Sequence, residues 1–166
     1  LRVAEYSGFL AQALGWKDEE IQNLKYIALL HDIGKVGVPD HVLNKPGKLT
    51  AAEYNIIKSH TTIGGEILKD IETIKHVDSG AKYHHERYDG KGYPNGLVGD
   101  KIPEVARILG VADAYDAMAS NRSYREVLPQ EVVRSEIEKG KGTQFDPHIA
   151  DIMLQMIDED AEYTMK

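Results

Sequence analysis

Residues 18–35, DEEIQNLKYIALLHDIGK, predict a helix with one buried face. Its apolar residues recur at steps of three and four, which places them on one side of a helix: Ile21, Leu24 and Ala28. Asp18 can cap the N-terminus of this helix, and Gly34 ends the helical pattern. His31 continues the buried face. We therefore expect a buried face that ends in a histidine, directly followed by the carboxylate of Asp32.

The same spacing recurs along the chain and predicts an all-α fold of about seven helices. Four helices are expected over residues 3–14, 18–31, 50–68 and 74–84, and three more begin at Pro103, Pro129 and Pro147. Thr50 and Glu53 form a capping box, whereas Gly64 and Gly65 should interrupt or thin the same helix. Residues 89–99 are rich in glycine and predict an irregular loop.

The composition excludes several classes of function. The chain has 166 residues, 42% of them hydrophobic, which suits one domain with a substantial core. The absence of cysteine excludes disulfides, thiolate metal sites and thiol nucleophiles. A net charge of −7 argues against a nucleic-acid polymer as partner, and no apolar run approaches the roughly 20 residues of a membrane span. The chain starts with Leu1 instead of Met, so we expect residues 1–166 to be one N-terminally truncated domain of a longer protein.

Three histidines occupy helix positions where the apolar pattern would place core residues: His31, His60 and His84. A lone histidine there is usually an ordinary core residue, but two of these three are followed directly by another potential ligand, Asp32 or His85. Asp113 also lies on an inward helix face, where a carboxylate is costly to bury unless it is paired or bound to metal. Imidazole and carboxylate ligands without thiolates favour Mn, Fe or Zn over Ca and Mg.

The spacing indicates more than one metal ion. Neighbouring residues of a regular helix differ by about 100° in direction, so His84 and His85 would not easily address the same ion. Asp32 has two carboxylate oxygens and can bridge two ions. Paired metals clamp the attacking and leaving oxygens of phosphoryl transfer, and a bridging water becomes hydroxide near neutral pH. The pattern therefore points to metal-assisted phosphoester hydrolysis.

Three cations near these ligands could bind a phosphate. Lys35 follows His31 by about one turn, and Arg122 and Arg125 follow Asp113. In an acidic chain, cations gathered beside a metal site form a local anion-binding patch. The alternative is that they are solvated charges at helix ends. We favour the phosphate interpretation.

Two motifs carry a resemblance to a known family. Residues 31–35, HDIGK, resemble the HD-x-G-K signature of the HD superfamily of metal-dependent phosphohydrolases, and residues 84–94, HHERYDGKGYP, resemble the HHExxDGxGYP signature of its HD-GYP subfamily. The second motif matches at every defined position. The resemblance covers nearly the whole chain and implies an all-α HD-domain bundle with an irregular, glycine-rich GYP loop.

The resemblance also implies roles for particular residues. The implied metal ligands are His31, Asp32 (bridging), His60, His84, His85 and Asp113, and the implied phosphate contacts are Lys35, Arg122 and Arg125. Family members hold two or three metals, commonly iron or manganese, with zinc, nickel or magnesium as alternatives. Family members also have a metal ligand just before the first helix. That position would precede Leu1, so the sequence does not distinguish two metal ions from three.

Tyr93 and Asp116 are further candidates for substrate binding. The GYP loop could line the substrate cleft or dock a partner domain through Tyr93, or it could simply be a turn that Glu86 and Asp89 hold by hydrogen bonds. Asp116 could contact the substrate or orient an arginine. Other tyrosines that could stack on a guanine base are Tyr83, Tyr88, Tyr115 and Tyr124.

The expected function is hydrolysis of cyclic di-GMP to pGpG or GMP by a metal-bridging hydroxide, with Asp32 and Lys35 as catalytic residues. Two alternatives stay open: another cyclic dinucleotide such as 3′,3′-cyclic GMP–AMP, or a non-catalytic sensor that signals through the GYP loop. A sensor should have lost ligands, whereas each ligand position that the chain covers is filled. The resemblance also implies a cytoplasmic signalling protein with an upstream sensory or receiver domain.

Overall fold

The computed structural model describes residues 1–120 and 127–165. These ranges contain eight α-helices, two short 3₁₀ helices and no strand. The α-helices are α1 (Arg2–Ala13), α2 (Asp18–Leu30), α3 (Asp40–Leu43), α4 (Ala51–Leu68), α5 (Val77–Tyr83), α6 (Glu104–Ala119), α7 (Gln130–Gly140) and α8 (Pro147–Glu159). The 3₁₀ helices are η1 (Ile33–Gly37) and η2 (Gly99–Lys101). The predicted all-α class is confirmed, and each of the seven predicted helices is found.

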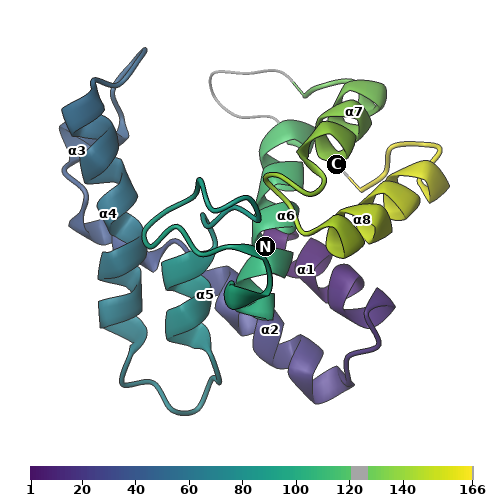
Figure 1. Ribbon diagram of the computed structural model, residues 1–166, viewed down its shortest axis with the longest axis horizontal. Coiled ribbons are helices and arrows are strands. Elements are labelled where there is room, and N and C mark those ends of the chain that lie inside the picture. Colours follow the sequence, from purple (N-terminus) through teal and green to yellow (C-terminus); the bar gives the residue numbers. More distant parts are fainter. Residues whose placement is uncertain (121–126, 166) are drawn as a thin grey trace.

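Helix α6 lies at the centre of the bundle (Figure 1). It packs against α1, α5, α7 and α8, and its inward side chains are fully buried, Ile108, Leu109 and Tyr115 among them. Helix α5 links this centre to α2 and α4. Helices α2 and α4 therefore meet α5, which in turn packs against α6, and these helices bring His31, His60 and His84 close together. In the described part of the chain, no helix combines the length and apolar character needed to cross a bilayer.

The crossing of η1 over α4 depends on small residues. A Cβ atom on Gly34 would lie 1.9 Å from the backbone oxygen of His60 and 2.5 Å from the backbone nitrogen of Gly64. Helix α4 runs without interruption through Gly64 and Gly65, so the predicted interruption is wrong. Gly64 packs against Ala81 and Gly34, and Gly65 packs against the side chain of Lys82. Close packing of neighbours explains the glycines better than a break in the helix does.

Several helix ends differ slightly from the prediction. Asp18 is the first residue of α2 instead of its cap, and the preceding Lys17 donates its backbone N–H to the carboxylate of Glu20 at 2.9 Å. Pro103 and Pro129 precede their helices because their ψ angles of 136° and 143° are extended. Helix α5 begins three residues late, and the short helix α3 was not predicted because four residues are too few to establish a periodicity.

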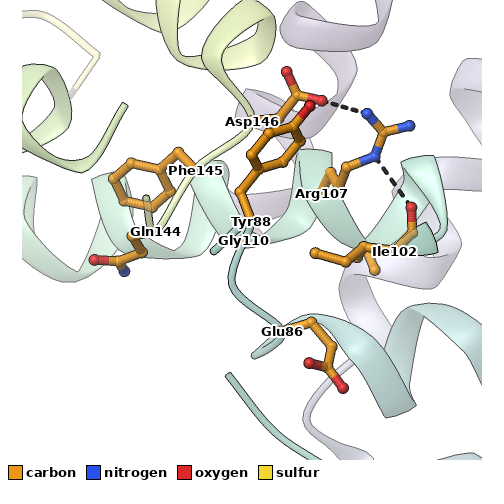
Figure 2. Close-up of a pocket in the computed structure, with 9 residues that line it drawn as sticks. Glu86, Tyr88, Ile102, Arg107, Gly110, Gln144, Phe145 and Asp146 are labelled. Carbon is orange, nitrogen blue, oxygen red and sulfur yellow. Dashed lines mark hydrogen bonds and ion pairs between the residues drawn. The ribbon is translucent and has the colours of Figure 1, made fainter. Parts of the chain in front are cut away.

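The segment after α5 is fastened to α6 and to the turn before α8 (Figure 2). The backbone of Tyr88 and Asp89 donates to residues 143–144, at 3.3 Å to Gln144 and 2.8 Å to Thr143. Beside this point, the guanidinium of Arg107 donates to the carboxylate of Asp146 and to the backbone oxygen of Ile102. The base of the GYP loop therefore has a defined position relative to the helices.

Candidate metal centre

Six side chains from four helices converge at one place beside α6. They come from the end of α2, the middle of α4, the end of α5 and the middle of α6: His31, Asp32, His60, His84, His85 and Asp113. His31, His60 and His84 are buried, and His85 is half-buried. The six predicted ligands thus include residues 82 positions apart, brought together by helix packing.

Backbone carbonyl groups orient three of the imidazoles. The Nδ1 atoms of His31, His60 and His84 lie 2.6, 2.6 and 2.8 Å from the carbonyl oxygens three residues earlier in the chain. A carbonyl oxygen can only accept, so each Nδ1 carries the proton and donates it. In a neutral ring the Nε2 atom is then left with a free lone pair, the form that binds metal. All three Nε2 atoms are prepared as ligands in this way.

These lone pairs face one another. The Nε2 atoms of His60 and His84 are 3.4 Å apart, although two neutral Nε2 acceptors cannot form a hydrogen bond. The Nε2 atom of His31 is buried and has no hydrogen-bond partner among the residues that the structure describes. A buried acceptor without a donor is unfavourable. A cation between these nitrogens relieves this, so the side chains present fit a divalent metal ion.

Two carboxylates add negative charge to the same place. Asp32 lies with Oδ2 3.4 Å from Nε2 of His31 and with Oδ1 3.5 and 3.9 Å from Nε2 of His60 and His84. Asp113 places Oδ1 3.9 Å from Nε2 of His31. Asp32 therefore reaches the imidazoles of α2, α4 and α5 with its two oxygens, as a bridging ligand must.

The ligand atoms form two overlapping groups. One contains His60, His84 and His85, the other contains His31, Asp32 and His84, and within each group the potential ligand atoms lie within 4.8 Å of one another. The sequence predicts that His84 and His85 would not easily address one ion from a regular helix. Both follow the last residue of α5, so the angle between helical neighbours does not apply to them, and their potential ligand atoms lie within 4.8 Å of each other. The two groups overlap at His84, whose single free Nε2 lone pair can bind one ion, so a second position would depend on Asp32 and the remaining ligands.

The pKa values follow from burial and from the carboxylates. Burial lowers the pKa of His60 and, with its imidazole neighbours, lowers that of His84 strongly and that of His85 to about 4. Burial opposes charge on His31 too, but Asp32 and Asp113 raise its pKa above the ordinary value. Burial likewise opposes charge on Asp32, while His31 and Lys35 hold its pKa below the usual range. Three neutral imidazoles beside an ionised carboxylate are the protonation state that metal binding requires.

Comparisons with known proteins agree with this geometry. A family model described as "HD domain" matches residues 1–149. The chain belongs to the HD domain family. This match and the relatives below confirm the resemblance drawn from the two motifs.

Two curated relatives of this HD domain are similar over most of the chain. The cyclic di-GMP phosphodiesterase response regulator RpfG of Xanthomonas campestris is 43% identical over 157 residues, which are 93% of this chain and 41% of that protein. The 3′3′-cGAMP-specific phosphodiesterase 2 of Vibrio cholerae is 40% identical over 163 residues, which are 95% of this chain and 31% of that protein. The chain thus spans less than half the length of either relative.

Two solved structures share the HD-domain fold. An HDG"Y"P protein from Bdellovibrio bacteriovorus superposes with a TM-score of 0.75 at 23% identity, covering 94% of this chain and 50% of that one. A cyclic GMP–AMP specific phosphodiesterase of V. cholerae, V-cGAP3, superposes with a TM-score of 0.70 at 19% identity, covering 98% of this chain and 44% of that one. These likenesses concern the fold.

Lys35 lies at the edge of the candidate metal centre. Its Nζ lies 2.6 Å from Oδ2 of Asp32, and its side chain is 42% exposed. The ammonium therefore holds the carboxylate that the histidines share, while part of its surface faces solvent. A phosphate that approached the centre from solvent would meet this charge.

The GYP loop lies directly on the ligand-bearing turn. Tyr93 donates its backbone N–H to the carbonyl oxygen of His85 at 3.2 Å, and its ring lies 4.9 Å from the imidazole of His85 at an angle of 30°. The buried carboxylate of Glu86 accepts the backbone N–H groups of Asn95 at 2.7 Å and Leu97 at 2.9 Å. Glu86 directly follows His84 and His85, so its hydrogen bonds fasten the loop to the turn that carries these two ligands.

Other predicted positions have different outcomes. The carboxylate of Asp116 accepts a hydrogen bond from Nε of Arg2 at 2.7 Å, so α1 and α6 are joined there. Arg122 and Arg125 lie outside the residues that the structure describes, as does Tyr124. Tyr115 is fully buried against Tyr6 and cannot stack on a base. The three histidines that are not predicted ligands are exposed: His41, His76 and His148.

Sequence reasoning missed two residues beside the centre, Tyr54 and Lys58. Both belong to α4, four residues apart, and both approach the ring of Tyr93. Their spacing of four residues places both on one side of the helix that carries His60, and this shared face could have been predicted from the sequence. Their proximity to Tyr93 depends on the packing of the GYP loop against α4.

Proposed function

We propose that this HD domain is a metal-dependent phosphodiesterase that hydrolyses cyclic di-GMP to pGpG or GMP. The observation that carries the proposal is the set of imidazole Nε2 atoms that face one another around Asp32. Bound divalent ions would generate a nucleophile from water and neutralise charge on the phosphoryl group. The similarity to proteins named as cyclic di-GMP phosphodiesterases supports this substrate.

The proposed metal ligands are the six predicted residues, His31, Asp32, His60, His84, His85 and Asp113. Asp32 would bridge two positions, because its two oxygens lie within 3.9 Å of three different imidazoles. Two or three ions are compatible with this ligand set, and iron or manganese suits imidazole with carboxylate better than magnesium does. The backbone carbonyls that accept from Nδ1 keep each ring in the binding orientation.

Lys35 is proposed as the residue that meets the scissile phosphate. Its ammonium already sits 2.6 Å from Asp32, so a phosphoryl oxygen bound next to that carboxylate comes within reach of it. A positive charge held there stabilises the negative charge that grows on the phosphoryl oxygens. Arg122, Arg125, Tyr93 and Asp116 remain proposed substrate contacts, of which Asp116 would have to act while bound to Arg2.

A second candidate substrate is 3′,3′-cyclic GMP–AMP. The observation that favours it is the 40% identity to a relative named as specific for this dinucleotide. The metal centre acts on the phosphodiester, which both dinucleotides share. Side-by-side turnover of the two substrates decides between them.

We further propose that residues 1–166 act as one domain of a longer cytoplasmic signalling protein. The named response regulator among the relatives, which is more than twice as long as the matched region, supports an upstream sensory or receiver domain. The GYP loop is a proposed docking site for such a partner, since part of it is exposed beside the centre.

The test is metal analysis combined with product analysis. Full-length protein loaded with iron or manganese should convert cyclic di-GMP to pGpG or GMP, and Asp32→Ala should lose both metal and turnover. Asp70→Ala removes an exposed aspartate just after α4 and serves as the matched control. Wild-type activity in Asp32→Ala would refute the mechanism.

A further inference from the structure

Two tyrosines and a lysine form a continuous surface beside the metal centre. The rings of Tyr54 and Tyr93 are 6.4 Å apart and nearly perpendicular, at 82°. The Nζ atom of Lys58 lies 5.2 Å from the centre of the Tyr54 ring and 5.9 Å from that of Tyr93. The ammonium is thus held by two aromatic faces, one from α4 and one from the GYP loop.

No carboxylate of the described residues, 1–120 and 127–165, forms an ion pair with Lys58. Three other lysines, Lys35, Lys45 and Lys69, each lie within 2.8 Å of an Asp or Glu oxygen. Among the described residues, no carboxylate oxygen lies within 4.0 Å of Nζ of Lys58, which is half-buried. A fixed ammonium without a counter-ion attracts an anion, most strongly where solvent is partly excluded.

The surface is continuous with the proposed catalytic centre. From the centre outward, the imidazole of His60 lies 5.2 Å from that of His85, which lies 4.9 Å from the ring of Tyr93. Tyr54 and Lys58 extend this wall along α4, on the side toward its N-terminus. Tyr54 is 46% exposed, so its ring offers an open face to a ligand. A molecule bound at the metal centre and extending along α4 would meet this face next.

We propose that Tyr54, Lys58 and Tyr93 form a subsite for one nucleotide of a cyclic dinucleotide, in which a purine base stacks on the exposed tyrosine and Lys58 meets the phosphate that is not being hydrolysed. The inference rests on the proposed function and adds recognition residues to it. Aromatic rings stack on any base, and lysine binds phosphate as a point charge. The subsite therefore supports binding of both cyclic di-GMP and 3′,3′-cyclic GMP–AMP without choosing between them.

Steady-state kinetics of the full-length, metal-loaded protein test the subsite. Tyr54→Ala and Lys58→Met should each raise KM for cyclic di-GMP about tenfold, with kcat changed less than about twofold, since a stacked base or a charge-assisted hydrogen bond contributes that much to binding. Tyr54→Phe, which keeps the ring, should restore most of the affinity. Lys58→Met should also weaken the dependence of KM on salt. Tyr26→Ala and Lys69→Met, which remove an exposed tyrosine and an exposed lysine elsewhere, are the matched controls.

A small phosphodiester separates binding from chemistry. For methyl p-nitrophenyl phosphate, which has no purine and no second phosphate, the loss in kcat/KM caused by Tyr54→Ala should be at least about fivefold smaller than for the dinucleotide. Equal losses on both substrates, or unchanged KM for the dinucleotide in both variants, would overturn the subsite. If the wild-type protein hydrolysed the small diester but neither dinucleotide, the proposed function itself would fail. Metal content should equal that of wild type in each variant.

Discussion

Glu86 provides the most direct test of how the GYP loop is held. Its buried carboxylate is 7% exposed and accepts two backbone N–H groups, from Asn95 at 2.7 Å and from Leu97 at 2.9 Å. Glu86→Ala removes both acceptors and leaves two donors without a protein partner. Glu86→Gln keeps the shape of the side chain, but its amide offers one oxygen, so one donor then faces an NH₂ group.

The expected loss of stability follows from the surroundings of the two donors. A hydrogen bond to a charged group contributes about 1.5–3 kcal/mol. Asn95 is exposed, so water replaces the carboxylate there, whereas Leu97 is half-buried and water reaches it less easily. We expect Glu86→Ala to lower the free energy of unfolding by about 2–3 kcal/mol, and Glu86→Gln by nearly as much.

Urea unfolding and amide hydrogen exchange measure this effect. Exchange should accelerate at Asn95 and Leu97, which lose their acceptor, and at Tyr93, which belongs to the same loop and donates to His85. Amides in the core of α6 should change only with global stability. Glu66→Ala is the matched control, since its exposed pair with Lys69 is worth under about 1 kcal/mol. If Glu86→Ala cost no more than Glu66→Ala and left loop exchange unchanged, the carboxylate would not hold the loop.

Three further predictions concern packing, pH and capping. Gly34→Ala places a Cβ atom within 1.9 Å of the backbone oxygen of His60, so η1 must move away from α4. We expect urea unfolding to show a free energy of unfolding lower by more than about 3 kcal/mol, and a metal titration to show weaker metal binding. Among the four imidazoles, His31 has a raised pKa and the other three have lowered pKa values, so between pH 5 and 7 a metal ion competes mainly with the proton on His31. Calorimetric titration with manganese should show the metal affinity falling by at most about tenfold for each pH unit of decrease. A steeper fall would contradict this order of pKa values. Asp146→Ala removes the N-terminal cap of α8 and a partner of Arg107, so thermal unfolding should show a free energy of unfolding lower by about 2–3 kcal/mol. Asp146→Asn keeps an oxygen that can cap the helix and should recover about 1 kcal/mol of this loss. Equal melting temperatures of the two variants would contradict a capping role.

The helices were largely predictable because their signals are local. The capping box of Thr50 and Glu53, with backbone N–H of Thr50 2.7 Å from the carboxylate, involves residues three apart. The same holds for the apolar faces of α2 and α6. The error at Gly64 arose because a glycine pattern does not distinguish a break from a close contact. Only the approach of Gly34, thirty residues away, explains why α4 needs no side chain there.

The candidate centre was predictable to a different degree for each of its features. The two motifs named four of the six ligand residues, and the inward helix faces with the wider resemblance named His60 and Asp113, since residue type limits which groups can bind metal. The motifs did not contain the orientation of the rings, the two overlapping groups around His84, or the surface formed by Tyr54, Lys58 and Tyr93. Each of these depends on distances between helices.

From sequence alone followed the all-α class, the identity of the candidate ligands and the glycine-rich loop, because helix periodicity and side-chain chemistry are properties of short segments. Tertiary structure alone decided that Nε2 of His60 and His84 lie 3.4 Å apart with Asp32 between the helices, and that Tyr93 covers His85. The contact between His60 and His84 joins residues 24 positions apart. The contact between Tyr93 and His85 follows from the path of the loop that Glu86 holds. Their geometry is set by core packing, which local patterns do not specify.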